Sequence, residues 1–165
     1  MRVLHADRLV DLKRIPDLDR ICLSEHGDFV IGARATHRQI ETSSLIREAL
    51  PALSQLCSQV ANIRVRSVGT IGGNLCHADP TGDPPAALIA LGAEVEIASI
   101  DRRRRILVED LARDYMETIL EPHELLVAIH LPAPAPRSGS AYLKHRVRGV
   151  DTAIVRMAAA ETGVT

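Results

Sequence analysis

The sequence predicts an α+β fold, and three patterns carry that prediction. Residues 94–98 alternate charged and apolar side chains with the two-residue period of a half-buried strand. The apolar residues between Leu45 and Val60 recur every three or four positions, as in a helix with one buried face. Asp83 and Pro84 resemble a helix start, and Gly92 follows the last apolar residue of that segment. Mixed strands and helices in 165 residues fit one layered α+β domain.

The elements of the first half follow from turn and cap residues. Residues 9–12 form a short apolar run that we expect to be a strand, and residues 29–31 follow a Gly-Asp turn signal and predict a second strand. Ser43 or Ser44 can cap the helix that ends near residue 60. Pro51 lies inside that helix and should kink or restart it.

In the second half we expect a tight turn at Gly72-Gly73 and then a helix from Asp83 to Leu91, with Asp83 as its cap. Strands are predicted over 94–98 and over 106–108, where the chain returns from an arginine turn, and a short helix or irregular segment is predicted over 111–120. A strand over 125–131 should end at Pro132, followed by a loop over 132–140 and two strands around Gly149 within 141–160.

Composition excludes several classes of protein. The chain is 46% hydrophobic and 25% charged, so it can bury a core. A net charge of −1 and only 2% aromatic residues argue against a nucleic-acid partner, because neither a basic field nor stacking platforms are present. The run Arg102 to Arg105 is expected to be a solvated hairpin tip rather than a phosphate-binding patch.

The positions of the three cysteines and the lengths of the apolar runs give expectations about metal sites, cellular compartment and membrane spans. Cys22, Cys57 and Cys76 are far apart and no C-x-x-C occurs, so this chain alone predicts neither a zinc site nor an iron–sulfur cluster. Reduced thiols and the lack of a signal-peptide pattern in the first ten residues favour a cytoplasmic protein. No apolar run approaches the length of a membrane span.

The stretch GTIGGNLCHADPTGDPP, residues 69–85, is the most informative part of the chain. Glycine has no Cβ and tolerates positive φ, so a turn at Gly72 and Gly73 would let backbone N–H groups approach an anionic oxygen closely. Thr70 and Asn74 would add side-chain donors at the two ends of that turn. The alternative is a plain surface turn between two elements.

This stretch resembles the second flavin-binding motif in the FAD subunit of molybdenum hydroxylases, which are the medium subunits of xanthine dehydrogenase and carbon monoxide dehydrogenase type enzymes. That motif reads T-I-G-G-N/D/S, followed by a run similar to A-x-P-x-x-D-x-P. Further segments resemble the family in the same order: RLVDLKRIPDL (8–18), GDFVIGARATHRQIE (27–41), EPHELLVAIHLP (121–132) and AYLKHRVRGVDTAIVRMAAA (141–160).

The resemblance implies an oxidoreductase flavoprotein subunit with FAD as its cofactor. The implied fold is the second lobe of a PCMH-type (vanillyl-alcohol-oxidase-like) FAD-binding domain, with an antiparallel sheet flanked by helices. The implied partners are an iron–sulfur small subunit and a molybdopterin large subunit, from which electrons would reach FAD and then an acceptor such as NAD or a quinone. Neither nucleic acid nor a membrane span is implied.

The same resemblance assigns a set of cofactor-binding residues and no catalytic or metal-binding ones. Those in the motif, expected to act mostly through backbone donors, are Thr70, Ile71, Gly72, Gly73 and Asn74.

Asp83, later in the same stretch, together with Leu126 and Lys144 completes the assignment, and Tyr142 is a further, weaker match. Asp83 matches a carboxylate near the ribose of FAD or adjacent groups, although it could also cap the next helix. Leu126 matches an apolar position against the flavin or adenine, with strand core as the alternative. Lys144 matches a basic residue beside the flavin, where a cation would stabilise negative charge on the ring, and its alternative is a surface lysine. Tyr142 matches a position that in some members places an aromatic ring against the flavin.

Two other side-chain groupings in the motif favour no site. His77 and Asp79 lie on one loop and would not complete a metal site by themselves. Cys76 and His77 could form a thiol–base pair, but adjacent side chains usually point apart, so we expect Cys76 to be a buried, inert thiol.

The chain also differs from the family pattern. Family members carry an earlier loop similar to A-G-G-x-S/T that holds the FAD pyrophosphate, and no such motif occurs before residue 69. The family's C-terminal domain is not present after residue 165 either. Residues 1–165 are therefore expected to form a partial FAD-binding domain. The alternative is a non-catalytic remnant that keeps the lobe fold but does not bind FAD tightly.

Overall fold

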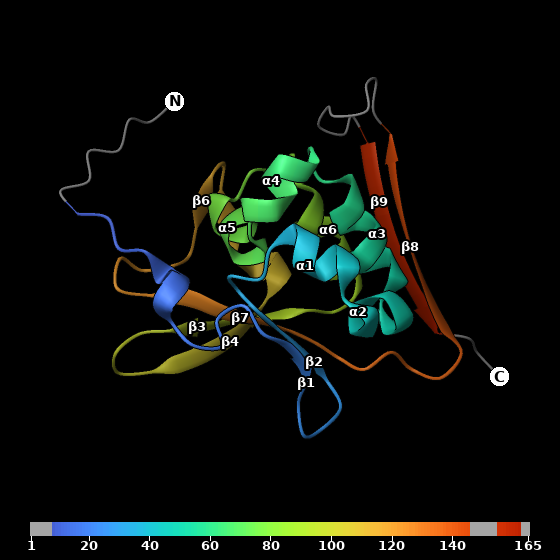
Figure 1. Ribbon diagram of the computed structural model, residues 1–165, viewed down its shortest axis with the longest axis horizontal. Helices are drawn as coiled ribbons and strands as arrows, with labels where there is room; N and C mark the ends of the chain where they lie inside the picture. Colours follow the sequence, from blue (N-terminus) through green and yellow to red (C-terminus); the bar gives the residue numbers. More distant parts are fainter. Residues whose placement is uncertain (1–7, 146–154, 163–165) are drawn as a thin grey trace.

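The computed structural model describes residues 8–145 and 155–162. Its main feature is a five-stranded antiparallel sheet in the order β1-β2-β7-β3-β4 (Figure 1). The strands are β1 (Ile21–Leu23), β2 (Phe29–Gly32), β3 (Glu94–Ala98), β4 (Arg103–Leu107) and β7 (Leu125–Leu131). An α+β fold with helices against an antiparallel sheet is thereby confirmed.

Six helices cover one side of this sheet (Figure 1). They are α1 (His37–Thr42), α2 (Ser44–Ala49), α3 (Pro51–Gln59), α4 (Ile63–Val68), α5 (Ile71–His77) and α6 (Asp83–Ala90). Short 3-10 turns, η1 (Leu12–Arg14) and η2 (Val108–Asp110), and a small hairpin of β5 (Ala112–Asp114) and β6 (Glu117–Thr118) fill the connections.

A second hairpin closes the helical layer from its other side. Strands β8 (Ser138–His145) and β9 (Val155–Thr162) pair only with each other and lie beside α3 and α6 (Figure 1). Tyr142 of β8 is 1% exposed and belongs to the same hydrophobic core as the sheet. Helices α3 and α6 are therefore packed between the sheet and this hairpin.

Apolar residues from alternate positions of the central strands form the core. Ile129 pairs with Ile31 on one side and with Val95 on the other, and all three side chains are fully buried. The period-two pattern predicted for 94–98 is confirmed, since Val95 and Ile97 are buried while Glu96 is not.

The helices begin and end at residues that satisfy their terminal groups. Thr36 forms a capping box with Gln39 at the start of α1, and Ser43 caps α2. Pro51 begins α3, so the predicted restart of the helix at this residue is confirmed. Gly92 has a φ of +65° just after α6, as a helix stop requires.

Several predicted elements are wrong. Residues 9–12 form no strand: Leu9 and Val10 are 93% and 82% exposed, and Leu12 opens a 3-10 turn. Residues 111–120 contain the β5–β6 hairpin rather than a helix. The sequence analysis also missed β1, α1 and α4. Two strands do flank the connection that holds Gly149, but Gly149 itself lies outside the described residues.

The arginine run is also placed differently. Arg103, Arg104 and Arg105 lie within β4, and the turn itself is formed by residues 99–102. Each of these side chains faces a carboxylate: Arg103 Nη1 lies 2.6 Å from Glu96 Oε1, and Arg104 makes two hydrogen bonds, of 2.9 and 2.7 Å, to Glu124. The predicted hairpin tip is therefore wrong for these three residues, whose side chains pair with Glu96 of β3 and with Glu124 just before β7.

Candidate cofactor-binding site

The glycine motif is a helix rather than a tight turn. Thr70 is the N-cap of α5, its Oγ1 accepts the N–H of Gly73 at 3.1 Å, and neither Gly72 nor Gly73 has a positive φ. The predicted turn is therefore wrong. Gly72 is required for a different reason: a Cβ there would lie 2.6 Å from the Cβ of Ala33, so only glycine lets α5 pack this closely on the end of β2.

The backbone donors of the motif already have acceptors inside the chain. The N–H groups of Ile71 and Gly72 donate to the carbonyls of Ala35 and Ala33, at 2.9 and 2.8 Å. That of Asn74 donates to the carbonyl of Thr70 at 3.0 Å. Cofactor binding mostly through these backbone donors, as the sequence analysis expected, would require those hydrogen bonds to be given up.

Three other groups of the motif remain available to a ligand. Gly73 is exposed, and the only atom near the position of a Cβ is Thr70 Oγ1, at 2.8 Å. The hydroxyl hydrogen of Thr70 has no acceptor among the described residues. Asn74 Oδ1 is buried and has no hydrogen-bond donor among them. The motif therefore offers one donor, one acceptor and a bare stretch of backbone.

Asp83 and Lys144 contact each other. Lys144 Nζ donates to Asp83 Oδ2 at 2.6 Å, and the hydroxyl of Tyr142 donates to Asp83 Oδ1 at 2.9 Å. Asp83 is the first residue of α6, but Gly82 is its N-cap and no side chain caps it, so the capping alternative for Asp83 is wrong. The surface-lysine alternative for Lys144 is also wrong, because its side chain is 2% exposed.

An ammonium group carries three N–H donors, and the structure gives Lys144 only one acceptor among the described residues. A buried cation with unfilled donors is costly unless another oxygen reaches it. The site of Lys144 is therefore suited to one more acceptor. Tyr142 lies in the core and its hydroxyl is held by Asp83, which does not resemble the ring-stacking position considered above.

Leu126 lies in β7, pairs with Ile97 and is 3% exposed. This burial agrees with its strand-core alternative. Leu126 belongs to the same buried core as Ile71 and Leu75 of the motif. The backbone connects them too: the carbonyl of its neighbour Val127 accepts the N–H of Ala33, whose carbonyl accepts that of Gly72. The structure thus brings β7, the end of β2 and α5 together.

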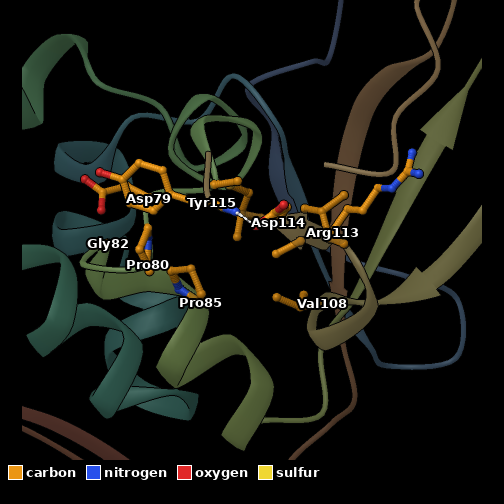
Figure 2. A pocket seen from close by; sticks show the side chains of 12 residues that line it. Asp79, Pro80, Gly82, Pro85, Val108, Arg113, Asp114 and Tyr115 are labelled. Atoms are coloured by element: carbon orange, nitrogen blue, oxygen red, sulfur yellow. Dashed lines mark hydrogen bonds between the residues drawn. The ribbon is translucent and has the colours of Figure 1, made fainter. Parts of the chain in front are cut away.

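A pocket of about 380 Å³ adjoins the motif. Asp79, Pro80, Gly82 and Pro85 line it from one segment, and Val108 with residues 111–115 lines it from another (Figure 2). A Cβ on Gly82 would lie 3.2 Å from Asn74 Oδ1, so the unpartnered oxygen of Asn74 lies close to the first of these segments. The volume lies within the range of small-molecule pockets.

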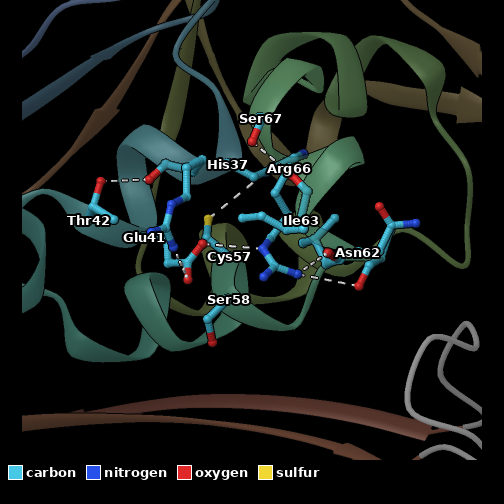
Figure 3. Close-up of polar contacts among 12 residues, drawn as sticks. His37, Glu41, Thr42, Cys57, Ser58, Asn62, Ile63, Arg66 and Ser67 are labelled. Atoms are coloured by element: carbon cyan, nitrogen blue, oxygen red, sulfur yellow. Dashed lines mark hydrogen bonds and ion pairs between the residues drawn. The ribbon is translucent and has the colours of Figure 1, made fainter.

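His37 is a buried residue that the sequence analysis missed. It is 2% exposed at the start of α1, and its Nδ1 lies 4.0 Å from Cys57 Sγ of α3 (Figure 3). Burial lowers the pKa of His37 to about 4, although the charge of Asp83 acts in the opposite direction. Burial also raises the pKa of the Cys57 thiol, so both groups are neutral at pH 7.

The other reactive side chains of the motif form no site. Within the part of the chain that the structure describes, no group of His, Cys, Asp or Glu could hold a metal ion. Asp79 Oδ1 instead accepts from the N–H and hydroxyl of Thr81, both at 2.7 Å. Cys76 is exposed, contrary to the expected burial, but desolvation raises the pKa of its thiol and keeps it protonated.

Comparison with known families identifies one match. The family described as "FAD binding domain in molybdopterin dehydrogenase" matches residues 1–134. Among similar proteins is the 6-hydroxypseudooxynicotine dehydrogenase complex subunit alpha of Paenarthrobacter nicotinovorans, 35% identical over 153 residues, which cover 93% of this chain and 51% of that protein. The carbon monoxide dehydrogenase medium chain of Afipia carboxidovorans is 36% identical, with 92% and 53% covered.

Solved structures agree with these matches. A reconstituted CO dehydrogenase from Oligotropha carboxidovorans superposes with a TM-score of 0.86 at 33% identity, covering 90% of this chain and 52% of that one. Carbon monoxide dehydrogenase from Hydrogenophaga pseudoflava gives a TM-score of 0.81 at 33% identity, covering 86% and 49%. The chain therefore spans about half the length of the relatives it matches.

The available groups fit FAD by their chemistry. FAD carries anionic phosphate oxygens together with ribityl and ribose hydroxyls, so it can both accept from Thr70 or Lys144 and donate to Asn74 Oδ1. Gly73, which stands between Thr70 and Asn74 in the sequence, is exposed and leaves the backbone there open to a ligand. An unpartnered buried acceptor beside unfilled donors is the pattern expected of a site for a ligand with both kinds of group.

Proposed function

The chain belongs to the family of FAD binding domains in molybdopterin dehydrogenases, and from this membership we propose that it is the FAD-binding part of the medium subunit of a molybdenum hydroxylase. FAD is the cofactor of this family, and the chain is an oxidoreductase flavoprotein subunit by relationship. FAD, when bound, supplies the electron transfer; the protein supplies binding, orientation and electrostatics.

The observation that carries the proposal is the set of unfilled groups around Gly73. The Thr70 hydroxyl would donate to an oxygen of the cofactor, and Asn74 Oδ1 would accept from one of its hydroxyls. Gly73 would let the cofactor approach the backbone of α5. These groups lie within residues 70–74, which the sequence analysis assigned to FAD.

Lys144 would add a positive charge, with its orientation fixed by Asp83. Asp83 carries the counter-charge of the Lys144 ammonium. We therefore propose that Lys144 acts as a hydrogen-bond donor to the cofactor rather than as an unpaired cation. Leu126 is proposed to support the site from the sheet.

We further propose that the chain works in a complex with an iron–sulfur small subunit and a molybdopterin large subunit in the cytoplasm. The support is that its relatives include proteins named as the medium chain of carbon monoxide dehydrogenase. The structure has, within residues 8–145 and 155–162, no helix with the length and apolar character that a membrane crossing requires. A remnant without FAD is not favoured, because the complete T-I-G-G-N motif and its unfilled groups are present.

Titration with FAD tests the proposal. The fluorescence of FAD should be quenched saturably by the chain, and Gly73→Val should weaken the binding at least tenfold, because its side chain blocks the approach to the backbone. Gly139→Val is the matched control, since Gly139 is a strand residue with open space around its Cβ position. The absence of saturable binding, or equal weakening by both variants, would contradict the proposal.

A further inference from the structure

His37 is a buried polar side chain with one ring nitrogen unfilled. Its Nδ1 faces Cys57 Sγ at 4.0 Å, and Nε2 has no hydrogen-bond partner among the described residues. Only 2% of the residue is exposed, and Nε2 is not one of the fully buried side-chain atoms without a partner, which are Arg34 Nε and Asn74 Oδ1 among the described residues. A polar atom that has no partner in the chain and is not fully shut off from the surface is one that a ligand or water can reach.

The position of the ring is fixed by three helices. The backbone N–H of His37 donates to the carbonyl of Gly69 at 3.0 Å, and Thr36 pairs with Thr70 in an isolated β-bridge. Arg66 of α4 joins Glu41 of α1 at 3.2 Å and also donates to the carbonyl of Val60 at 3.1 Å, after α3 (Figure 3). These contacts hold α1, α3 and α4 around the imidazole.

The unfilled edge of the ring faces the start of the cofactor motif. A Cβ on Gly69 would lie 3.5 Å from His37 Cδ2, the atom next to Nε2, so this edge lies against the residue before Thr70.

The neighbour on the opposite edge favours one tautomer. The Cys57 thiol is fully buried and protonated, so its S–H can donate to Nδ1. A neutral imidazole that accepts at Nδ1 carries its proton on Nε2. In this tautomer His37 presents an uncharged N–H donor on the edge that faces Gly69.

We infer that His37 is an additional binding residue of the cofactor site, whose Nε2–H donates to an oxygen of FAD held beside Thr70. This inference rests on the proposed function. Cys57 is then a positioning residue, because it acts through the tautomer of His37 and does not itself reach the ligand. A neutral donor suits this place, since Lys144 already supplies a cation whose charge Asp83 balances.

Nitrogen NMR on the unmodified chain is the first test. Long-range 1H–15N spectra should show His37 with its proton on Nε2, and saturation with FAD should shift that resonance and slow its exchange with water. The Nδ1–H tautomer, or an Nε2 resonance that FAD leaves unchanged, would overturn the inference even if FAD binds.

Variants give an independent second test. His37→Leu should weaken FAD binding about tenfold, the effect of losing one hydrogen bond, while His37→Gln should recover most of the affinity through its amide N–H. His26→Gln is the control, because His26 is exposed and lies in the turn before β2. FAD affinities that are equal in the unmodified chain and both His37 variants would overturn this inference alone, whereas no binding by the unmodified chain would overturn the proposed function.

Discussion

Lys144 Nζ lies 2.6 Å from Asp83 Oδ2, so two residues assigned to the cofactor form an ion pair with each other. Their side chains are 2% and 8% exposed, and they join β8 to the start of α6 across 61 residues of sequence. The pair therefore has two roles, since it holds the β8–β9 hairpin against the helices and fixes the direction of the Lys144 ammonium.

Breaking this pair on one side should be strongly destabilising. Asp83→Asn leaves the Lys144 charge buried without its counter-charge, and we expect the free energy of unfolding to fall by about 3–5 kcal/mol. Lys144→Met should be comparably harmful. The double variant should lose markedly less than the sum of the two, because no uncompensated charge remains. Chemical denaturation of the four proteins measures the coupling, and strictly additive losses would contradict a buried ion pair.

Substitution by alanine should destabilise the protein much more at Gly72 than at Gly73. Gly72→Ala places a Cβ 2.6 Å from the Cβ of Ala33, and we expect a loss of about 1–3 kcal/mol or more from overpacking. Gly73→Ala meets only the Thr70 hydroxyl and should change stability by less than about 1 kcal/mol. Thermal unfolding separates the two variants. Equal destabilisation would show that both glycines serve packing alone.

The elements that could be predicted from the sequence are those with a strong local pattern. Alternation identified β3, and Pro51 marked the start of α3, because both signals act within a few residues. Helix α1 carries a local signal as well, the capping box of Thr36 and Gln39, which could have revealed it.

The features that could not be predicted depend on long-range contacts. The need for glycine at position 72 arises from Ala33, which no local pattern connects to it. The pairing of Asp83 with Lys144 and the burial of His37 likewise arise only once β8 and α3 pack on their neighbours. The sequence therefore suggested residues for the site but could not give their contacts.

Thr70 should contribute to both stability and cofactor binding. Thr70→Val removes the hydroxyl that caps α5 and the hydrogen that is free for a ligand, so we expect a loss of about 1 kcal/mol in stability together with weaker FAD binding. Thr70→Ser keeps the hydroxyl and should restore both properties. Calorimetry and FAD titration on the same samples test this. Full FAD affinity in the valine variant would remove Thr70 from the binding site.

His37 should make the stability of the protein depend on pH. Burial, together with the positive charge of Arg66 and against the negative charge of Asp83, lowers its pKa from the ordinary 6.5 to about 4. Between these two values the unfolded chain binds more protons than the folded one, so the free energy of unfolding must fall as the pH falls. The contribution is complete above pH 6.5 and is lost progressively down to about pH 4, with a total on the order of 3 kcal/mol.

Denaturation of the unmodified chain at several pH values between 7 and 4 measures this slope. His37→Gln stays neutral throughout and should show a clearly smaller loss of stability on acidification, although it is less stable at neutral pH. His26→Gln should keep the full slope, because His26 is exposed and the imidazole of His37 is left in place. A slope that persists in the His37→Gln variant would mean that His37 is not the buried neutral imidazole on which the binding inference depends.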